Sequence, residues 1–243
     1  MPPIKWQAVT VTKLLDETPY TRTLRMEVPG WPGHRAGQHV DLRLTAEDGY
    51  QAERSYSIAS PPEQETLEIT VDRIDAGEVS PYLAGELRVG DQFELRGPIG
   101  GYFVWSVEDG GPVFLIAGGS GVVPLMAMVR HRAAQESDAD VKLLISARTH
   151  DRLIYARELD ARSSEANLDI AITLTLEQPA GWQGYARRVD DSMIHEILAG
   201  RAADHRVYIC GPTPFVEAVS ELLLQAGVPS EQVSTERFGP SGK

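Results

Sequence analysis

The periodicity of the sequence changes near residue 108, and this change limits the folds that the chain can adopt. Between residue 4 and about residue 105, short runs with polar–apolar alternation are separated by glycine- and proline-containing turns. Such runs are typical of antiparallel strands. We expect strands at 8–12, 21–28, 38–44, 54–59, 66–74 and 92–96. Six short strands of this kind predict an antiparallel six-stranded β-barrel.

A different pattern follows the turn-forming segment Glu108-Asp109-Gly110-Gly111-Pro112. Apolar runs at 112–117, 141–146, 168–176 and 206–210 alternate with helix-like segments at 122–134, 154–162, 190–198 and 214–226. This alternation predicts an α/β domain in which a parallel sheet is covered by helices on both faces. We therefore expect two domains, 1–107 and 108–243.

Composition excludes several functional classes. No apolar run reaches the length of a membrane span, and the N-terminus lacks the apolar core of a signal peptide, so we expect a cytoplasmic protein that binds no membrane. A net charge of −12 argues against nucleic acid as the main partner. The single cysteine, Cys210, cannot form an internal disulfide or hold an iron–sulfur cluster alone, and the six histidines show no ligand spacing. We predict no metal.

The segment Arg54-Ser55-Tyr56-Ser57 places a cation, an aromatic ring and hydroxyl groups within four residues. On an extended strand residues 54 and 56 share one face, so the guanidinium can bind a phosphate while the ring packs on a flat group. A flavin dinucleotide is anionic in one part and flat in another, and it suits this combination. An ordinary barrel strand with a surface arginine is the alternative.

A second segment, Gly77-Glu78-Val79-Ser80-Pro81, reads as the start of a short helix. Ser80 is predicted to be its N-cap, with Pro81 at the first helical position. Unpaired backbone N–H groups at such a start favour phosphate, and Gly77 permits close approach of the backbone. A plain helix start in a loop is the alternative.

With Gly97-Pro98-Ile99-Gly100, these motifs resemble the ferredoxin–NADP reductase superfamily over nearly the whole chain. Within it the chain is most similar to FAD-containing reductase components of bacterial oxygenases without a fused ferredoxin domain. The resemblance implies that the tetrad binds FAD, with Arg54 on the pyrophosphate, Tyr56 on the ring and Ser57 near flavin N5. The other implied FAD contacts are the backbone of Ile69, Thr70 and Val71, and the pyrophosphate loop residues Gly77, Val79 and Ser80.

The turn Gly118-Gly119-Ser120-Gly121 follows an apolar strand and opens a helix, a context in which glycine turns hold a pyrophosphate. It lacks the G-x-G-x-x-G spacing. A serine-hydrolase elbow would need glycine at position 122, which is Val122, and no Walker A motif is present. The resemblance implies that Gly119, Ser120, Gly121 and Pro124 bind the nicotinamide nucleotide.

Two later segments complete the predicted site. Cys210-Gly211-Pro212 follows an apolar strand, and ligands of open α/β sheets bind at the carboxyl ends of strands. The resemblance puts Cys210 beside the nicotinamide and the flavin, with Gly211 and Pro212 in the nucleotide site; a buried structural thiol is the alternative. Glu236-Arg237-Phe238 resembles the family's acidic–x–aromatic ending. By that resemblance Phe238 covers the flavin and Glu236 assists hydride or proton movement, whereas a frayed polar tail is the alternative.

The expected activity is transfer of hydride from NADH or NADPH to FAD, followed by transfer of single electrons to a separate ferredoxin or oxygenase component. The predicted catalytic residues are Ser57, Cys210, Glu236 and Phe238. Arg148 favours NADPH, but Leu176 stands where NADPH-preferring relatives often carry arginine, so NADH is slightly favoured. We expect a monomer. The alternatives are a flavin-binding relay or regulatory subunit that does not turn over nicotinamide, and a nucleotide-binding protein without flavin.

Overall fold

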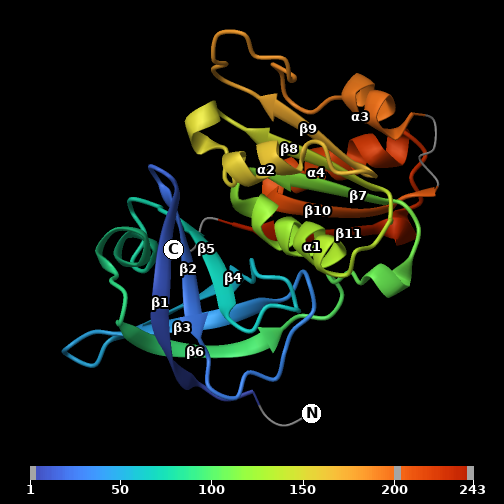
Figure 1. Cartoon of the computed structure of the whole chain (residues 1–243). Coiled ribbons are helices and arrows are strands. Elements are labelled where there is room, and N and C mark those ends of the chain that lie inside the picture. The colour runs from blue at the N-terminus through green and yellow to red at the C-terminus, as the bar shows by residue number, and fades with distance from the viewer. Residues whose placement is uncertain (1–3, 200–203, 240–243) are drawn as a thin grey trace.

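A computed structural model describes residues 4–199 and 204–239 of the chain. The two halves form two bodies that lie side by side, with the N-terminal half in blue to green and the C-terminal half in green to red (Figure 1). The first half contains β1 (Gln7–Thr18), β2 (Thr21–Glu27), β3 (His39–Thr45), β4 (Gln51–Ser57), β5 (Leu67–Asp72) and β6 (Gln92–Ile99).

These six strands form one antiparallel sheet in the order β4-β3-β6-β1-β2-β5. Its two outer strands meet where Ile58 bridges Ile69 and the Ala59 amide donates to the Glu68 carbonyl at 2.7 Å, so the sheet curls back on itself. Apolar residues of every strand fill the interior. The prediction of a six-stranded antiparallel barrel is confirmed.

The second half contains β7 (Val113–Gly118), α1 (Val122–Ala134), β8 (Val141–Ala147), α2 (Ala156–Arg162), β9 (Leu168–Leu174), α3 (Asp191–Leu198), β10 (Arg206–Pro212), α4 (Thr213–Gln225) and β11 (Val233–Phe238). The strands form a parallel sheet in the order β11-β10-β7-β8-β9. Every residue of the central strand β7 is buried, as the uninterrupted apolar run of 112–117 predicts.

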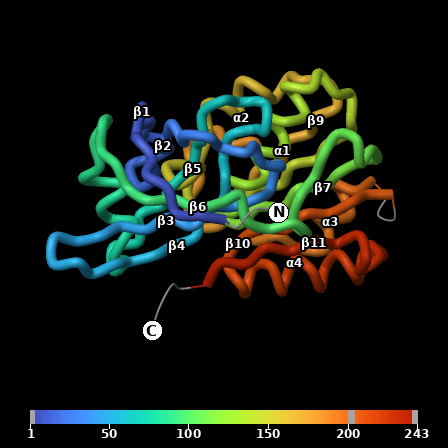
Figure 2. Tube along the Cα trace, turned by 90° about the horizontal axis from the view of Figure 1, so that it is seen from below, coloured from blue at the N-terminus to red at the C-terminus, as the bar shows by residue number. Residues whose placement is uncertain are grey.

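Successive side chains of β7 point to opposite faces of this sheet. Leu115 packs in the cluster that contains α1 and Leu159 of α2, whereas Phe114 and Ile116 pack against α3 and α4. Figure 2, which views the molecule from below, shows α1 and α2 on one side of the sheet and α3 and α4 on the other. The parallel sheet with helices on both faces is confirmed.

The bounds of several strands differ from the predicted ones. Strand β1 runs over Gln7–Thr18 rather than 8–12, and β4 covers Gln51–Ser57 rather than 54–59. Strand β10 does not end at Cys210 but continues through Pro212. The segment treated as a possible frayed tail forms β11, which pairs in parallel with β10, and Cys210 lies in register with Glu236. Because β11 is a polar edge strand, its sequence carries no apolar run that would reveal it.

Candidate functional site

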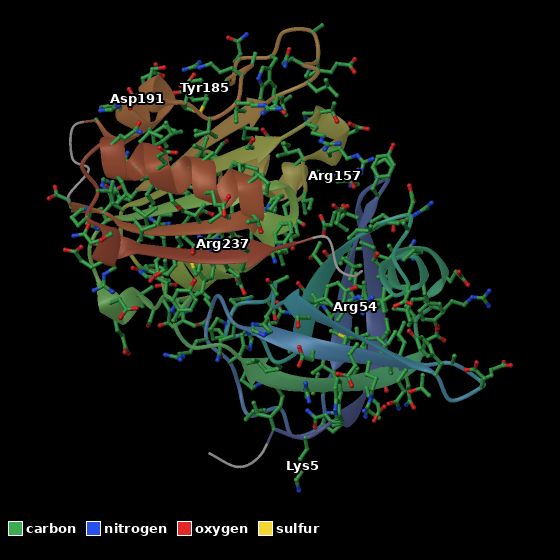
Figure 3. The ribbon with its side chains drawn as sticks, turned by 180° about the vertical axis from the view of Figure 1, so that it is seen from behind. Lys5, Arg54, Arg157, Tyr185, Asp191 and Arg237 are labelled. Carbon is green, nitrogen blue, oxygen red and sulfur yellow. The ribbon has the colours of Figure 1, made fainter. Side chains whose placement is uncertain are left out.

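A cleft of about 1030 Å³ lies where the two halves meet. The first half contributes residues of β4, β5 and the segment 74–80, and the second half contributes the ends of β10 and β11 with the turn before α1. Figure 3 labels Arg54 on the first half and Arg237 on the second, and both line the cleft. The cleft is therefore built from segments about 180 residues apart in the sequence.

One wall carries Arg54 at a fixed position beside the segment 77–80. An Arg54 Nη2 proton is donated to Glu78 Oε2 at 2.9 Å, and Nη1 donates to the Glu53 carbonyl at 2.7 Å. The hydroxyl of Tyr50 donates to the other oxygen of Glu78 at 3.2 Å. The Arg54 guanidinium is thus paired with the Glu78 carboxylate of the same chain.

Tyr56 and Ser57 continue this wall. Tyr56 packs against the barrel core, and burial raises the pKa of its hydroxyl above the ordinary value, so the ring stays neutral. Ser57 pairs with His39 of the neighbouring strand β3. The hydroxyl of Ser55 donates to Asp41 of β3 at 2.6 Å in an exposed hydrogen bond.

The segment 77–80 forms a tight turn into a short π-helical segment, Tyr82–Glu86. The prediction that Ser80 is the N-cap was wrong: Ser80 lies within the first helical turn, Pro81 precedes the π-helical residues, and no side chain caps them. The Ser80 hydroxyl instead accepts from the Ile74 amide at 3.0 Å and holds the turn closed. A Cβ at Gly77 would lie 3.0 Å from both the Ile74 carbonyl and the Ser80 hydroxyl, so any other residue here would force these neighbours to shift by a few tenths of an ångström.

The opposite wall is formed by the adjacent strands β10 and β11. Cys210 is 1% exposed, and burial, followed by the charge of Glu236, raises the pKa of its thiol well above the ordinary value. Burial also raises the pKa of Glu236 to about 7. Its Oε2 atom is buried without a hydrogen-bond partner among the described residues, and its Oε1 lies 3.8 Å from Nδ1 of His39. A thiol and a carboxyl that is easily protonated thus face the barrel wall.

The glycine turn packs directly on this wall. Gly119–Gly121 form a single 3₁₀ turn between β7 and α1, and Ser120 lines the cleft. A Cβ at Gly121 would lie 2.0 Å from the carbonyl oxygen of Cys210, which leaves no room for any other residue. The turn and the end of β10 therefore form one packed unit at the carboxyl edge of the sheet, where open α/β sheets bind ligands.

Comparison with known proteins agrees with this architecture. Residues 9–104 match the model of the oxidoreductase FAD-binding domain, and residues 115–221 match that of the oxidoreductase NAD-binding domain. The cytochrome P450 reductase GcoB of Amycolatopsis superposes with a TM-score of 0.85 at 26% identity, over 99% of this chain and 72% of that one. The chain belongs to the ferredoxin–NADP reductase superfamily.

Curated relatives within this superfamily include reductases of oxygenases. The glycine betaine monooxygenase reductase subunit of Chromohalobacter salexigens is 31% identical over 95% of this chain and 64% of the relative. The reductase component DmpP of phenol 2-monooxygenase from a Pseudomonas species is 29% identical over 97% of this chain and 66% of the relative. The chain spans less than two thirds of the length of the glycine betaine monooxygenase reductase subunits it matches.

The structure brings most of the predicted site residues of this superfamily member to the cleft. Those that line it are Arg54, Ser55, Tyr56, Ser57, Thr70, Gly77, Val79, Ser80, Ser120, Cys210, Glu236 and Phe238. The predicted residues that do not line it are Ile69, Val71, Gly119, Gly121, Pro124, Arg148, Gly211 and Pro212. The side chains of Ile69 and Val71 point into the barrel core, so only their backbone is available for the predicted role.

Sequence reasoning did not single out several residues that line the cleft, namely His39, Tyr50, Asp72, Ile74, Ala76, Glu78, Val123 and Arg237. A signal existed for Glu78, because it lies inside the predicted phosphate-binding segment. Tyr50 carried no signal, since its position beside Glu78 depends on the pairing of β3 with β4.

The residues present fit a flavin dinucleotide. The cleft joins a cation and a glycine-containing turn, which suit a pyrophosphate, to a neutral tyrosine ring and the orphaned Glu236 Oε2, which suit a flat heterocycle with polar edges. Its volume is at the upper end of the range for ligand pockets. Among residues 4–199 and 204–239, no three His, Cys, Asp or Glu side chains cluster as metal ligands would.

Proposed function

We propose that the protein is an FAD-dependent NAD(P)H oxidoreductase that passes electrons to a separate ferredoxin or oxygenase component. The observation that carries this proposal is that one cleft is lined both by Arg54 and Tyr56 of the FAD-binding domain and by Cys210 and Phe238 of the NAD-binding domain. When bound there, FAD supplies the conversion of a two-electron hydride donor into a one-electron donor.

The residues of the barrel wall would bind and orient the cofactor. Arg54 and the turn at Gly77 would hold its pyrophosphate, and Tyr56 would support one face of its ring. For this to occur, Arg54 must exchange its contact with Glu78 for a phosphate oxygen or share its donors between the two.

The opposite wall would position the nicotinamide. Gly121 brings the glycine turn against Cys210, and the small thiol, kept protonated by burial, permits close approach without acting as a nucleophile. Phe238 is 38% exposed at the cleft, so its ring would cover the flavin until a nicotinamide replaces it. Glu236 would hold a proton at its Oε2 atom near neutral pH.

The partners and setting follow from the same proposal. The oxygenase reductases among the relatives support an oxygenase component or a ferredoxin as acceptor. We propose a cytoplasmic monomer with domains 1–107 and 108–243, with NADH as the slightly favoured donor. Across the part of the chain that is described, no helix combines the length and apolar character that crossing a bilayer demands.

The test begins with the purified protein and added FAD. We expect a flavin absorbance spectrum that co-purifies with the protein, rapid anaerobic bleaching by NADH or NADPH, and reduction of an artificial one-electron acceptor. A protein that binds FAD but is bleached by neither nucleotide would be the relay subunit instead. A protein that takes up no FAD would refute both.

A further inference from the structure

We infer that Tyr155 is a positioning residue: its buried hydroxyl ties the NAD-binding domain to Thr70 on the flavin-facing wall and thereby sets the spacing across the cleft. This inference rests on the proposed function. It concerns a residue that lies outside the cleft and that none of the predicted motifs contains.

Tyr155 has an unusual position and conformation. It precedes α2 in the NAD-binding domain, is 2% exposed, and has a backbone φ of 63°. A bulky residue rarely adopts this left-handed conformation, and such outliers persist only where the surroundings hold them in place. The guanidinium of Arg130 stacks 4.5 Å above its ring and helps to hold it.

The tyrosine hydroxyl crosses the domain boundary to the hydroxyl of Thr70. Thr70 lies in β5, where Leu67, Ile69 and Val71 fill the barrel core and the alternate residues face outward. Thr70 therefore contacts Tyr155 from the same strand face that contributes to the cleft. A displacement of Tyr155 would therefore reach the cleft through Thr70.

Thr23 and Glu17 determine which hydroxyl donates in the hydrogen bond between Thr70 and Tyr155. Thr23 donates its only hydroxyl proton to Glu17 at 2.8 Å, so it must accept from Thr70, which lies 2.8 Å away. Thr70 in turn must accept from Tyr155. Burial raises the pKa of Tyr155 to about 12, which keeps its hydroxyl protonated and able to donate.

Arg130 links Tyr155 to the chain that follows strand β4, which contains Arg54 and Tyr56. Its Nη1 donates to the Ala59 carbonyl at 2.7 Å, and Ala59 directly follows Ile58 at the end of the segment that begins with Arg54. Glu158 of α2 accepts from the Nε atom of Arg130 at 3.1 Å. Tyr155, Arg130 and Glu158 thus form a partly buried cluster that joins α1 and the start of α2 to Ala59 and to Thr70 of β5.

The contact between Tyr155 and Thr70 should affect the rate at which NADH reduces the flavin. Transfer between two rings across the cleft depends on their separation within about 1 Å, and a misplacement of that size costs on the order of 100-fold. Tyr155→Phe removes one oxygen atom and leaves Thr70 without its donor. We expect the flavin of this variant to be reduced about 10- to 100-fold more slowly at saturating NADH, with an unchanged KM for NADH.

The matched control is Tyr208→Phe. Tyr208 is also buried, and its hydroxyl donates across the same boundary to the Val104 carbonyl at 2.9 Å. Val104 does not line the cleft. Tyr208→Phe thus removes a tyrosine hydroxyl from the domain boundary, as Tyr155→Phe does, but from a contact that does not reach the cleft. Its flavin should be reduced at the wild-type rate.

A second readout uses the protein without FAD. Hydrogen exchange of the amides in 67–72 should accelerate in Tyr155→Phe and stay unchanged in Tyr208→Phe, because only the former frees the outer face of β5. Thr70→Val should reproduce the slow reduction, and the double variant Tyr155→Phe/Thr70→Val should be no slower than either single variant.

The outcomes separate the inference from the proposed function. If the wild type is reduced and Tyr155→Phe is reduced equally fast, the positioning role is refuted while the oxidoreductase stands, even if the variant melts at a lower temperature. If Tyr208→Phe is slowed as much as Tyr155→Phe, the effect is general to the boundary and the specific role of Tyr155 is refuted. A wild type that neither nucleotide reduces refutes the proposed function and this inference together.

Discussion

The contact between Arg54 and Glu78 makes the affinity for FAD sensitive to two substitutions in opposite directions. The carboxylate of Glu78 lies 2.9 Å from the guanidinium that is proposed to bind the pyrophosphate. Glu78 therefore competes with the cofactor for the same donors. We predict that Arg54→Ala weakens FAD binding and that Glu78→Gln strengthens it.

The magnitudes differ because the two contacts differ. A hydrogen bond from arginine to a charged phosphate is worth about 1.5–3 kcal/mol, so Arg54→Ala should raise the Kd for FAD by about 10- to 100-fold. The ion pair is partly exposed, with 30% of the Arg54 side chain and 55% of the Glu78 side chain accessible. Such pairs are worth about 0.2–1 kcal/mol, so Glu78→Gln should lower the Kd by at most about 5-fold.

The assay is titration of the FAD-free protein with FAD, followed by quenching of flavin fluorescence or by calorimetry. Arg22→Ala is the control, because Arg22 forms a comparable ion pair with Asp16 at 2.7 Å but does not line the cleft. Salt should weaken the wild-type complex more than that of Arg54→Ala. An unchanged Kd in Arg54→Ala, or a weaker complex in Glu78→Gln, would refute this account of the cleft.

Three further predictions concern the opposite wall. Gly121→Ala should destabilise the fold by about 2 kcal/mol or more, because its Cβ would lie 2.0 Å from the Cys210 carbonyl oxygen. Gly85→Ala is the control and should not destabilise the fold, since its Cβ would meet no atom within 4 Å. Thermal unfolding of the two variants measures the difference. Because the pKa of Glu236 rises from 4.5 to about 7 on folding, stability is lost as pH rises between these values. In urea titrations, Glu236→Gln should therefore be more stable than the wild type at about pH 8, by at most about 3 kcal/mol, and as stable as the wild type at about pH 4. Equal stability of the two proteins at both pH values would contradict a raised pKa for the Glu236 carboxyl. Cys210, buried and protonated, should resist a thiol reagent in the native protein and react after unfolding, and rapid native labelling would show an accessible thiolate.

Much of the architecture could be predicted from local patterns. The apolar run of β7 and the strand–helix alternation after it indicated a parallel sheet, because a strand buried on both faces needs no polar positions. The alternating strands of the first half likewise indicated a barrel. In both cases the positions that are buried can be recognised from the apolar residues of the segment itself.

Features that depend on pairing between distant segments could not be read in this way. Strand β11 is polar, and it exists because β10 offers it a parallel partner across α4. The sequence of Ser80-Pro81 is that of a helix start, yet the serine hydroxyl is taken by the Ile74 amide. Tyr155 carried no motif, because its importance lies in reaching Thr70, 85 residues earlier in the chain.

The central claim is that the cleft between the halves holds a flavin with Tyr56 on one wall and Phe238 with Cys210 on the other. A crystal structure of the protein grown or soaked with FAD tests this most directly. The account predicts density for the isoalloxazine ring between Tyr56 and Phe238, with the pyrophosphate against Arg54 and Gly77. A cleft that stays empty at saturating FAD, or a flavin bound elsewhere on the molecule, would contradict it.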